Sequence, residues 1–265
     1  MSTAAFSLPG TQRIGCVLVH GFSATAQEMR PLGEALAARG FPVEGLLLPG
    51  HGTTLDAFAR VSFEDWYVAV MAGVERLRRH VPRVAIAGMS MGALLALLAA
   101  ARRPDLVDAL ALYAPALELA ADRRWLLRLL TSIPGLPRLL PTIPKGGGRG
   151  ISDPAARAAS PAYDRVPLPA IAELLTLKRL TRSVLARVTQ PTLVMHGRHD
   201  QTVPIDVVQI LEHELTASWI ETEILERSWH VITLDVEREH VAERTADFLA
   251  RAEAGLLTGA AAPIS

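Results

Sequence analysis

Cysteine is almost absent from this chain, since Cys16 is the single one among 265 residues. An internal disulfide is therefore excluded, and such low cysteine usage is typical of proteins from a reducing compartment. Cys16 lies within an apolar run that is typical of a strand. We expect it to be a small core residue rather than a reactive thiol.

An excess of charge of either sign is also lacking, because Lys and Arg total 27 and Asp and Glu total 27. Nothing in this balance favours nucleic acid or an anionic membrane surface as a partner. No apolar run reaches the roughly 18 residues of a membrane span. Residues 1–15 lack the basic segment and apolar run of a signal peptide. We therefore expect a cytoplasmic protein that binds no nucleic acid and does not insert stably into membranes.

Apolar sequence, in contrast, is abundant, since half of the residues are hydrophobic. The length suits one large α/β domain, residues 1–265. Runs typical of buried strands alternate with helix patterns, which predicts a doubly wound, mostly parallel sheet flanked by helices. Strands are expected at 14–20, 43–48, 84–89, 109–113, 192–196 and 219–225, with a short edge strand at 6–8. Helices are expected at 27–39, 62–80, 91–102, 204–213 and 235–251, the second capped by Ser62 and the last by Asp235.

The alternation of strands and helices stops between residues 116 and 187, which contain no strand pattern. Short helical pieces at 123–130 and 171–185 are separated there by many prolines. A long segment of this kind inside a compact domain is usually functional. We expect residues 116–187 to form a small helical cap, inserted before the strand that leads to Asp200.

The strand predicted at 84–89 runs into Gly88, Ser90 and Gly92, which form the pattern Gly-x-Ser-x-Gly. A buried strand, a sharp turn and a helix are the setting in which this pattern exposes a nucleophile. The glycines leave room for the turn, and the N-terminus of the following helix favours negative charge. The pattern alone also fits a tight turn with an idle serine, so residues elsewhere must decide between the two.

A serine hydroxyl becomes an effective nucleophile only beside a general base, which in turn needs an orienting carboxylate. Asp200 follows the strand 192–196, and His230 follows the strand 219–225. The carboxyl ends of parallel strands share one edge of a sheet, where ligands bind. The chain order Ser, Asp, His is also the one used on such sheets. We predict Ser90 as nucleophile, His230 as general base and then acid, and Asp200 as the orienting partner.

Other polar residues near these strands have simpler interpretations. Asp206 and Asp235 lie in or at the start of predicted helices, and we expect them to be structural. His196, His199 and Asp200 could suggest a zinc site, which would need a third converging ligand and an open position. We expect the two histidines to hydrogen-bond the loop that presents Asp200, and we expect no metal.

Acyl transfer places negative charge on the former carbonyl oxygen, which two backbone N–H groups usually stabilise. One donor is expected from Met91, the residue after the nucleophile. The other is expected from Phe22, in the turn that His20 and Gly21 begin. An ordinary turn remains the alternative interpretation of His20 and Gly21.

These residues together resemble the α/β-hydrolases, and more narrowly the chain is similar to small bacterial carboxylesterases and monoacylglycerol lipases. The resemblance covers nearly the whole core in the right order, at residues 20–22, 48–52, 88–92, 191–200 and 228–235. The last motif, with His followed by Val-Ile-Thr-Leu-Asp, is the most family-specific. The resemblance implies hydrolysis of carboxylic esters through an acyl-enzyme, without metal or cofactor. It also implies a triad of Ser90, Asp200 and His230 and an oxyanion hole of Phe22 and Met91.

The substrate is less well defined by this resemblance. The cap sequence is rich in leucine around 125–140, and we expect short- to medium-chain apolar acyl esters, with monoacylglycerols as candidates. Asp153, Ser160 and Asp164 are candidate contacts for a glycerol group. The expected partner is a small-molecule ester, and the chain is expected to be a monomer or a homodimer.

The same three residues would serve other reactions, so a thioesterase, a carbon–carbon hydrolase and a perhydrolase remain alternatives. Haloalkane dehalogenases and epoxide hydrolases fit less well, because they use an aspartate where this chain has Ser90. A non-catalytic protein that kept the fold would be expected to have a broken triad. No member of the triad is missing here.

Overall fold

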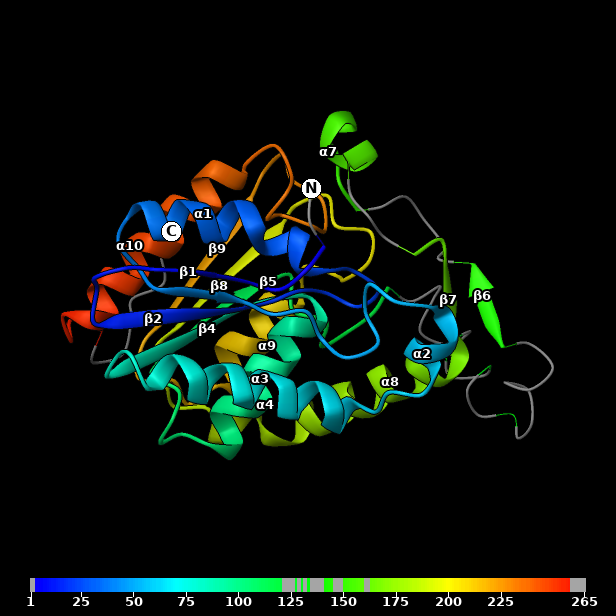
Figure 1. Ribbon diagram of the computed structural model, residues 1–265, viewed down its shortest axis with the longest axis horizontal. Coiled ribbons are helices and arrows are strands. Elements are labelled where there is room, and N and C mark those ends of the chain that lie inside the picture. The colour runs from blue at the N-terminus through cyan, green and yellow to red at the C-terminus, as the bar shows by residue number, and fades with distance from the viewer. Residues whose placement is uncertain are drawn as a thin grey trace.

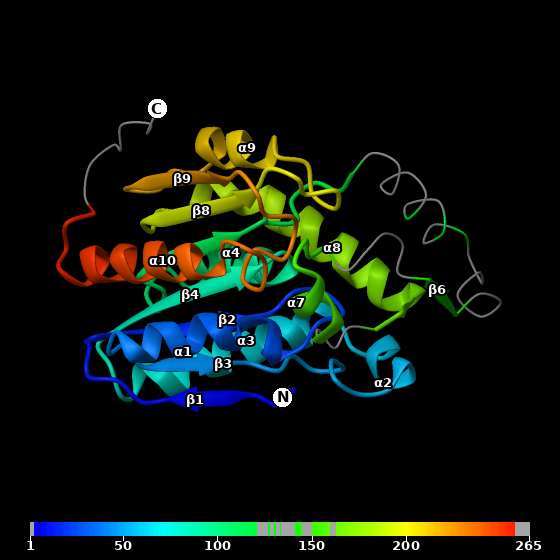
Figure 2. The same ribbon diagram turned by 90° about the horizontal axis from the view of Figure 1, so that it is seen from above.

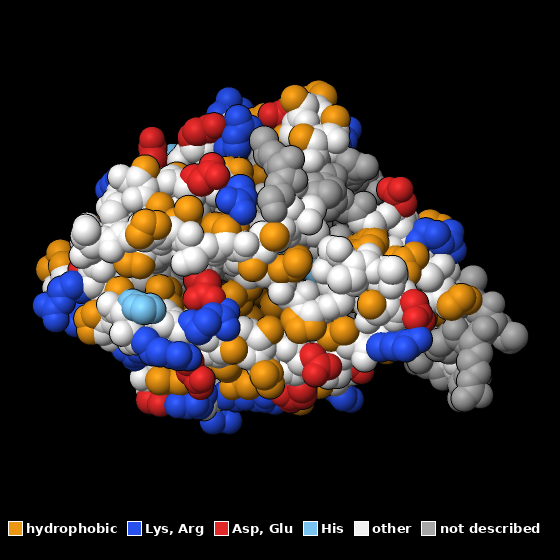
Figure 3. Space-filling model, in the orientation of Figure 1, with side chains coloured by type: hydrophobic (Ala, Val, Ile, Leu, Met, Phe, Trp, Pro, Cys, Tyr) orange, Lys and Arg blue, Asp and Glu red, His pale blue; other side chains and the backbone are white. Residues whose placement is uncertain are grey.

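The computed structural model describes residues 3–120, 127, 130, 133, 141–144, 150–159 and 163–257. Within them a seven-stranded sheet runs through the molecule, with helices on both of its faces (Figure 1). None of the helices in this part of the chain is long and apolar enough to cross a membrane. On the face shown in Figure 3, basic and acidic side chains are interspersed, as the equal numbers of the two charges suggest.

The strands lie in the order β1-β3-β2-β4-β5-β8-β9. Every neighbouring pair is parallel except β1 and β3, which are antiparallel. The order reverses direction around β2, as alternating crossovers on the two faces require. This confirms the predicted doubly wound, mostly parallel sheet. The strands are β1 (Phe6–Leu8), β2 (Ile14–Val19), β3 (Val43–Gly45), β4 (Arg83–Met89), β5 (Ala109–Tyr113), β8 (Thr192–Gly197) and β9 (Ile220–Leu225).

Helices cover the two faces unequally (Figures 1 and 2). The helices α1 (Arg30–Ala38) and α10 (Arg238–Glu253) pack side by side on one face. The opposite face carries α3 (Phe63–Arg78), α4 (Met91–Arg102), α8 (Leu168–Val184) and α9 (Val207–Glu214). Each layer has its own buried apolar cluster against the sheet.

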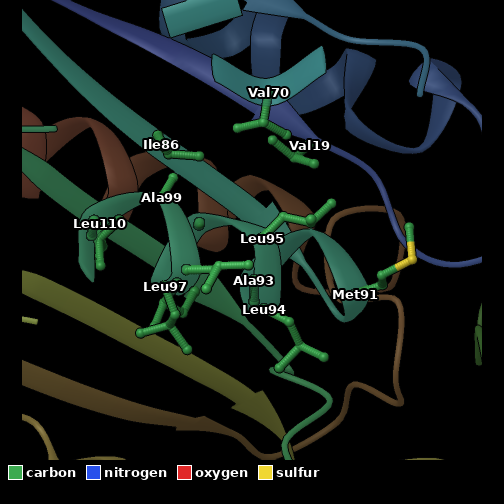
Figure 4. Packing of buried hydrophobic residues seen from close by; sticks show 14 of the residues in the cluster. Val19, Val70, Ile86, Met91, Ala93, Leu94, Leu95, Leu97, Ala99 and Leu110 are labelled. Atoms are coloured by element: carbon green, nitrogen blue, oxygen red, sulfur yellow. The ribbon is translucent and has the colours of Figure 1, made fainter. Parts of the chain in front are cut away.

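Every residue of the helix α4 except Arg102 is buried. Leucine and alanine fill it, and a helix that is apolar all round belongs in a core. Its side chains share one apolar cluster with Val70 of α3 and with Val19 and Ile86 of the sheet (Figure 4). Truncating such a leucine to alanine typically costs about 2 to 5 kcal/mol. The packing therefore holds the N-terminus of α4 rigidly at the end of β4.

Ser62 begins α3 as predicted, and the local chemistry explains why. Its hydroxyl accepts the backbone N–H of Asp65 at 3.2 Å, and the Asp65 carboxylate accepts the backbone N–H of Ser62 at 2.9 Å. This reciprocal capping box satisfies two N–H groups that a helix start leaves unpaired.

The segment between β5 and β8 contains strands that the sequence did not predict. A two-stranded antiparallel sheet pairs β6 (Thr142–Pro144) with β7 (Arg165–Pro167), so the expectation of no strand in 116–187 is wrong. Strands of three residues that end in proline show neither alternation nor an apolar run, which explains the miss. The segment also holds α7 (Pro154–Ala159), and the helix predicted at 171–185 is present as α8. The helix predicted at 123–130 lies largely outside the described residues.

Several predicted boundaries differ from the observed ones. The strand predicted at 43–48 ends at Gly45, and the helix predicted from residue 27 is split into η1 (Ala26–Met29) and α1. A short helix, α2 (Leu55–Ala59), was not predicted. The last helix begins at Arg238, with Glu237 at its N-cap, so the expectation that Asp235 caps it is wrong. Asp235 instead accepts hydrogen bonds from other segments, as described below.

Tyr163 attaches this segment to the loop that follows β3. Its hydroxyl accepts the backbone N–H of Thr53 and donates to the carbonyl of Thr53, both at 2.8 Å. Its ring stacks on Phe58 with centroids 5.7 Å apart. In Figure 1 β6 and β7 lie beyond one end of the main sheet, and Figure 2 shows β6 there as well.

Candidate active site

Ser90 lies at the junction of β4 and α4, in a backbone conformation that L-residues rarely adopt, with φ 54° and ψ −107°. The neighbours of this turn are too close for side chains. A Cβ on Gly88 would lie 2.3 Å from the Gly92 carbonyl oxygen, and one on Gly92 would lie 2.2 Å from the Val19 carbonyl oxygen. The two glycines of the pattern are therefore sterically required, and the strained turn is held by the packing of α4.

The three side chains predicted from the sequence form one hydrogen-bonded chain. Ser90 Oγ lies 3.0 Å from His230 Nε2, and His230 Nδ1 lies 2.6 Å from Asp200 Oδ2. The carboxylate can only accept, so Nδ1 carries the proton and Nε2 is left to accept the serine hydroxyl. The side chains of Asp200 and His230 are 1% and 11% exposed, so little water competes for these bonds.

Asp200 is held as an ionised carboxylate. Burial on its own would raise its pKa, but the nearby imidazole of His230, the hydrogen bond from it and His196 outweigh burial and lower the pKa below its ordinary value. Asp200 Oδ1 also accepts the backbone N–H groups of Thr202 at 2.7 Å and Val203 at 3.0 Å. The carboxylate is therefore fixed in place by the loop that carries it.

His196 supports this loop. Its Nε2 lies 3.2 Å from the carbonyl of Val203 and 3.4 Å from Asp200 Oδ2. Burial lowers the pKa of His196, so the ring is neutral and Nε2–H can donate. His199 contributes its backbone, donating to the Ser228 carbonyl at 3.2 Å. Within the described ranges no group of three or more His, Cys, Asp or Glu is arranged to hold a metal ion.

The turn that carries Phe22 lies against the nucleophile. A Cβ on Gly21 would lie 3.5 Å from Ser90 Cβ. The Gly21 carbonyl accepts from His20 Nδ1 at 2.9 Å and from the Ala24 N–H at 3.2 Å. Because a trans peptide is planar, the N–H of Phe22 points away from that carbonyl.

His20 has one defined tautomer. Its Nε2 accepts the backbone N–H of Leu48 at 3.1 Å, so the proton must be on Nδ1, which faces Gly21. Complete burial lowers the pKa of His20 to about 4, which keeps the ring neutral. The Phe22 ring packs against Phe58 and Trp66, with centroids 5.1 and 6.2 Å away. The backbone of this turn is therefore held from both sides.

The second predicted donor, the N–H of Met91, belongs to the first residue of α4. A helix leaves its first N–H groups without an intrahelical acceptor, and they carry partial positive charge. In the described part of the chain, neither the Met91 N–H nor the Phe22 N–H donates to another residue. Both donors are thus available to an oxygen atom beside Ser90.

Asp235 is a residue of the site that sequence reasoning placed wrongly. It is fully buried and accepts the backbone N–H of Trp229 at 2.7 Å, the residue before His230. It also accepts the N–H groups of Ser152 at 2.9 Å and Asp153 at 3.1 Å. One carboxylate therefore ties the His230 loop to the segment that precedes α7. The only sequence signal was its place at the end of the motif 228–235.

Two of the three candidate contacts for a glycerol group, Asp153 and Asp164, lie in the described residues. Asp153 accepts the N–H groups at the start of α7 and pairs with Arg238 at 3.2 Å. Asp164 is exposed, and no role for it is evident. Ser160 lies outside the described residues, as do most of the leucines near 125–140. Two that are described, Leu127 and Leu130, pack against the apolar cluster of Val166, Leu168 and Ile171.

Known proteins match the chain along most of its length. A family model described as serine aminopeptidase, S33, matches residues 10–237. The chain is 31% identical over 238 residues to the thermostable monoacylglycerol lipase of Bacillus sp. strain H-257, which covers 90% of this chain and 91% of that protein. It is 24% identical over 234 residues to the carboxylesterase of Bacillus subtilis strain 168, covering 88% and 91%.

Solved structures agree with this. A structure from work on two metagenome-derived lipolytic enzymes, LipS and LipT, superposes with a TM-score of 0.86 at 30% identity, over 94% of this chain and 98% of that one. The monoacylglycerol lipase of Paleococcus ferrophilus superposes with a TM-score of 0.79 over 94% and 98%. At 20% identity, the latter similarity concerns the fold alone.

Proposed function

We infer the function of this chain from its family, because the chain belongs to the serine aminopeptidase S33 family of α/β-hydrolases. We propose that it hydrolyses carboxylic esters through an acyl-enzyme formed on Ser90. Its relatives identify it as a hydrolase of the carboxylesterase and lipase type. The observation that carries the proposal is the chain of hydrogen bonds from Ser90 Oγ through His230 to Asp200.

In the first half-reaction, Ser90 Oγ attacks the ester carbonyl carbon as its proton passes to His230 Nε2. The imidazolium that forms is stabilised by the ionised Asp200, 2.6 Å from Nδ1. The former carbonyl oxygen becomes an oxyanion, which accepts the N–H groups of Phe22 and Met91. Each such donor is worth about 10²- to 10³-fold in turnover.

Collapse of the tetrahedral intermediate breaks the bond to the leaving alcohol, which takes the proton from His230 Nε2. The acyl group stays on Ser90 Oγ. In the second half-reaction a water molecule gives a proton to the neutral His230 and attacks the acyl carbon. His230 then returns the proton to Ser90 Oγ, and the carboxylic acid leaves with the enzyme in its starting state.

We further propose that residues 116–187 form a cap and that short- to medium-chain apolar acyl esters, monoacylglycerols among them, are the substrates. Support comes from an apolar cluster around Val166, Leu168 and Ile171, against which Phe22 packs. This cluster places apolar side chains of the inserted segment beside the turn that offers the Phe22 N–H. The monoacylglycerol lipase relative adds support for that substrate class.

The test is a panel of p-nitrophenyl esters of increasing acyl length, run beside monoacylglycerols and acyl thioesters on the purified protein and on Ser90→Ala. We expect activity on esters of up to medium chain length, and a loss of several orders of magnitude in Ser90→Ala with the fold retained. Faster turnover of thioesters than of matched esters would favour the thioesterase alternative. Activity retained in Ser90→Ala would refute the proposal.

A further inference from the structure

A carboxylate that the proposed mechanism does not use lies directly behind the turn of Gly21 and Phe22. It belongs to Glu28 in η1, and its Oε2 accepts the backbone N–H of Gly21 at 2.6 Å. A Cβ on Gly21 would lie 3.2 Å from this oxygen and 3.5 Å from Ser90 Cβ. A single glycine therefore separates the carboxylate from the nucleophile.

The hydrogen bond from Gly21 matters because glycine has the freest backbone of all residues. The Gly21 carbonyl is already held by His20 Nδ1 and by the Ala24 N–H. The Gly21 N–H is held by Glu28 alone among the described contacts. With both ends fixed, rotation about the two backbone bonds of Gly21 is blocked. That rotation would turn the next peptide, whose N–H belongs to Phe22.

We propose that Glu28 is a positioning residue, which holds Gly21 so that the Phe22 N–H faces the oxyanion formed beside Ser90. This inference rests on the proposed function, because it requires Phe22 to be an oxyanion donor. An N–H that donates to an ionised carboxylate makes a stronger bond than one that donates to a neutral acceptor. The position nevertheless needs an acceptor more than a charge, since a negative charge near an oxyanion is repulsive.

This distinction defines the variants. Glu28→Gln keeps an oxygen acceptor without the charge, whereas Glu28→Ala and Glu28→Met remove the acceptor, the second with little change in side-chain length. Glu34→Ala is the matched control, because Glu34 lies six residues further along in α1, its side chain is 60% exposed, and it pairs with Arg30 at 3.9 Å. The readouts are kcat and KM for a p-nitrophenyl ester and the affinity for a trifluoromethyl ketone, whose adduct with serine has an oxyanion.

We expect Glu28→Ala and Glu28→Met to lose about 10- to 100-fold in kcat with KM nearly unchanged, as for a misplaced transition-state contact. The affinity for the ketone should fall by the same factor. Glu28→Gln should stay within about 3-fold of the parent, and Glu34→Ala should match it. A merely structural role would lower the melting temperature without this parallel loss of kcat and ketone affinity.

Two results would overturn the inference. In the first, Glu28→Ala and Glu28→Met keep full kcat, so the Gly21 N–H needs no acceptor. In the second, Glu28→Gln falls as far as Glu28→Ala, so the residue acts through its charge. If Glu28→Ala fails to fold, Glu28→Met and Glu28→Gln still decide. Ser90→Ala, run alongside, separates the two claims: its retained activity would refute the proposed function, whereas an inactive Ser90→Ala beside an unaffected Glu28→Ala refutes only the role of Glu28.

Discussion

The carboxylate of Asp235 accepts the backbone N–H of Trp229 at 2.7 Å, one residue before His230. This bond ties the position of the imidazole to a buried carboxyl group that lies outside the hydrogen-bonded chain of Ser90. The same carboxylate holds Ser152, close to Gly150, whose carbonyl accepts the Val231 N–H at 2.8 Å. The loop of His230 is therefore clamped on both sides of the histidine.

Asp235→Asn is expected to weaken this clamp, because an amide offers one acceptor oxygen and turns its NH₂ toward a backbone N–H. Loss of part of a buried, charged hydrogen-bond network should lower the free energy of unfolding by about 2 to 4 kcal/mol. We also expect a lower kcat, since His230 would be less well placed. Urea unfolding and steady-state kinetics measure the two effects. Asp247→Asn is the control, because Asp247 is exposed and pairs with Arg39 at the surface. Equal stability of the two variants would contradict the role of Asp235.

Asp200→Asn should affect catalysis far more than folding. An asparagine at this position can donate to Nδ1, which would leave the proton of a neutral His230 on Nε2 and prevent it from accepting the serine proton. We expect kcat to fall by about 10⁴-fold with KM nearly unchanged, as when the orienting carboxylate of such a triad is replaced. Asp206 is exposed at the start of α9, so Asp206→Asn serves as the control and should keep the parent activity. Similar kinetics for the two variants would argue that Asp200 does not orient His230.

The residues that the sequence predicted best are those whose environment is local. A buried strand, a glycine on each side of Ser90 and an apolar helix follow each other without a gap, so pattern alone indicates the turn. Asp200 and His230 could be placed because parallel strands deliver their following loops to one edge. The order Ser, Asp, His along the chain then indicated which residue takes which role.

The residues and strands that were missed are defined by their contacts and not by local sequence patterns. Asp235 was expected to cap a helix, but its acceptors are used by segments more than 80 residues away, which propensity cannot show. Glu28 accepts the Gly21 N–H from η1, where a continuous helix was predicted. The strands β6 and β7 are defined by their pairing and not by their composition. Tertiary contacts override local signals in all three cases.

We expect acid to destabilise the protein over the pH range between the unfolded and folded pKa values of His20. Its pKa is lowered from 6.5 to about 4 in the folded state by burial, so between these values the unfolded chain binds more protons than the folded one. Stability is therefore fully present above the unfolded pKa and is lost as the pH falls toward the folded pKa. The loss between pH 7 and pH 5 should be about 2 kcal/mol from this group.

Urea unfolding of the parent and of His20→Asn at pH 7 and pH 5 checks this expectation. His20→Asn should be less stable at pH 7, because Leu48 loses its acceptor, but it should show a smaller drop at pH 5. Burial also lowers the pKa of His196, and its contribution cancels in the comparison of the two proteins. An identical drop in both proteins would mean that His20 is not the group that titrates.

Tyr163→Phe removes the hydroxyl that joins the inserted segment to Thr53, while keeping the ring stacked on Phe58. Global stability should fall by only about 1 kcal/mol, because water can replace the lost bonds at this partly exposed position. The larger effect should be local: opening of residues 116–187 becomes easier, so limited proteolysis should cut there sooner. Tyr67 lies on α3 and faces Arg102, so Tyr67→Phe is the control, and it should be cut at the parent rate.

If the insertion is a cap that contacts the acyl group, KM for a medium-chain ester should rise in Tyr163→Phe while KM for an acetyl ester stays unchanged. Equal shifts for the two esters would mean that this attachment does not serve acyl binding.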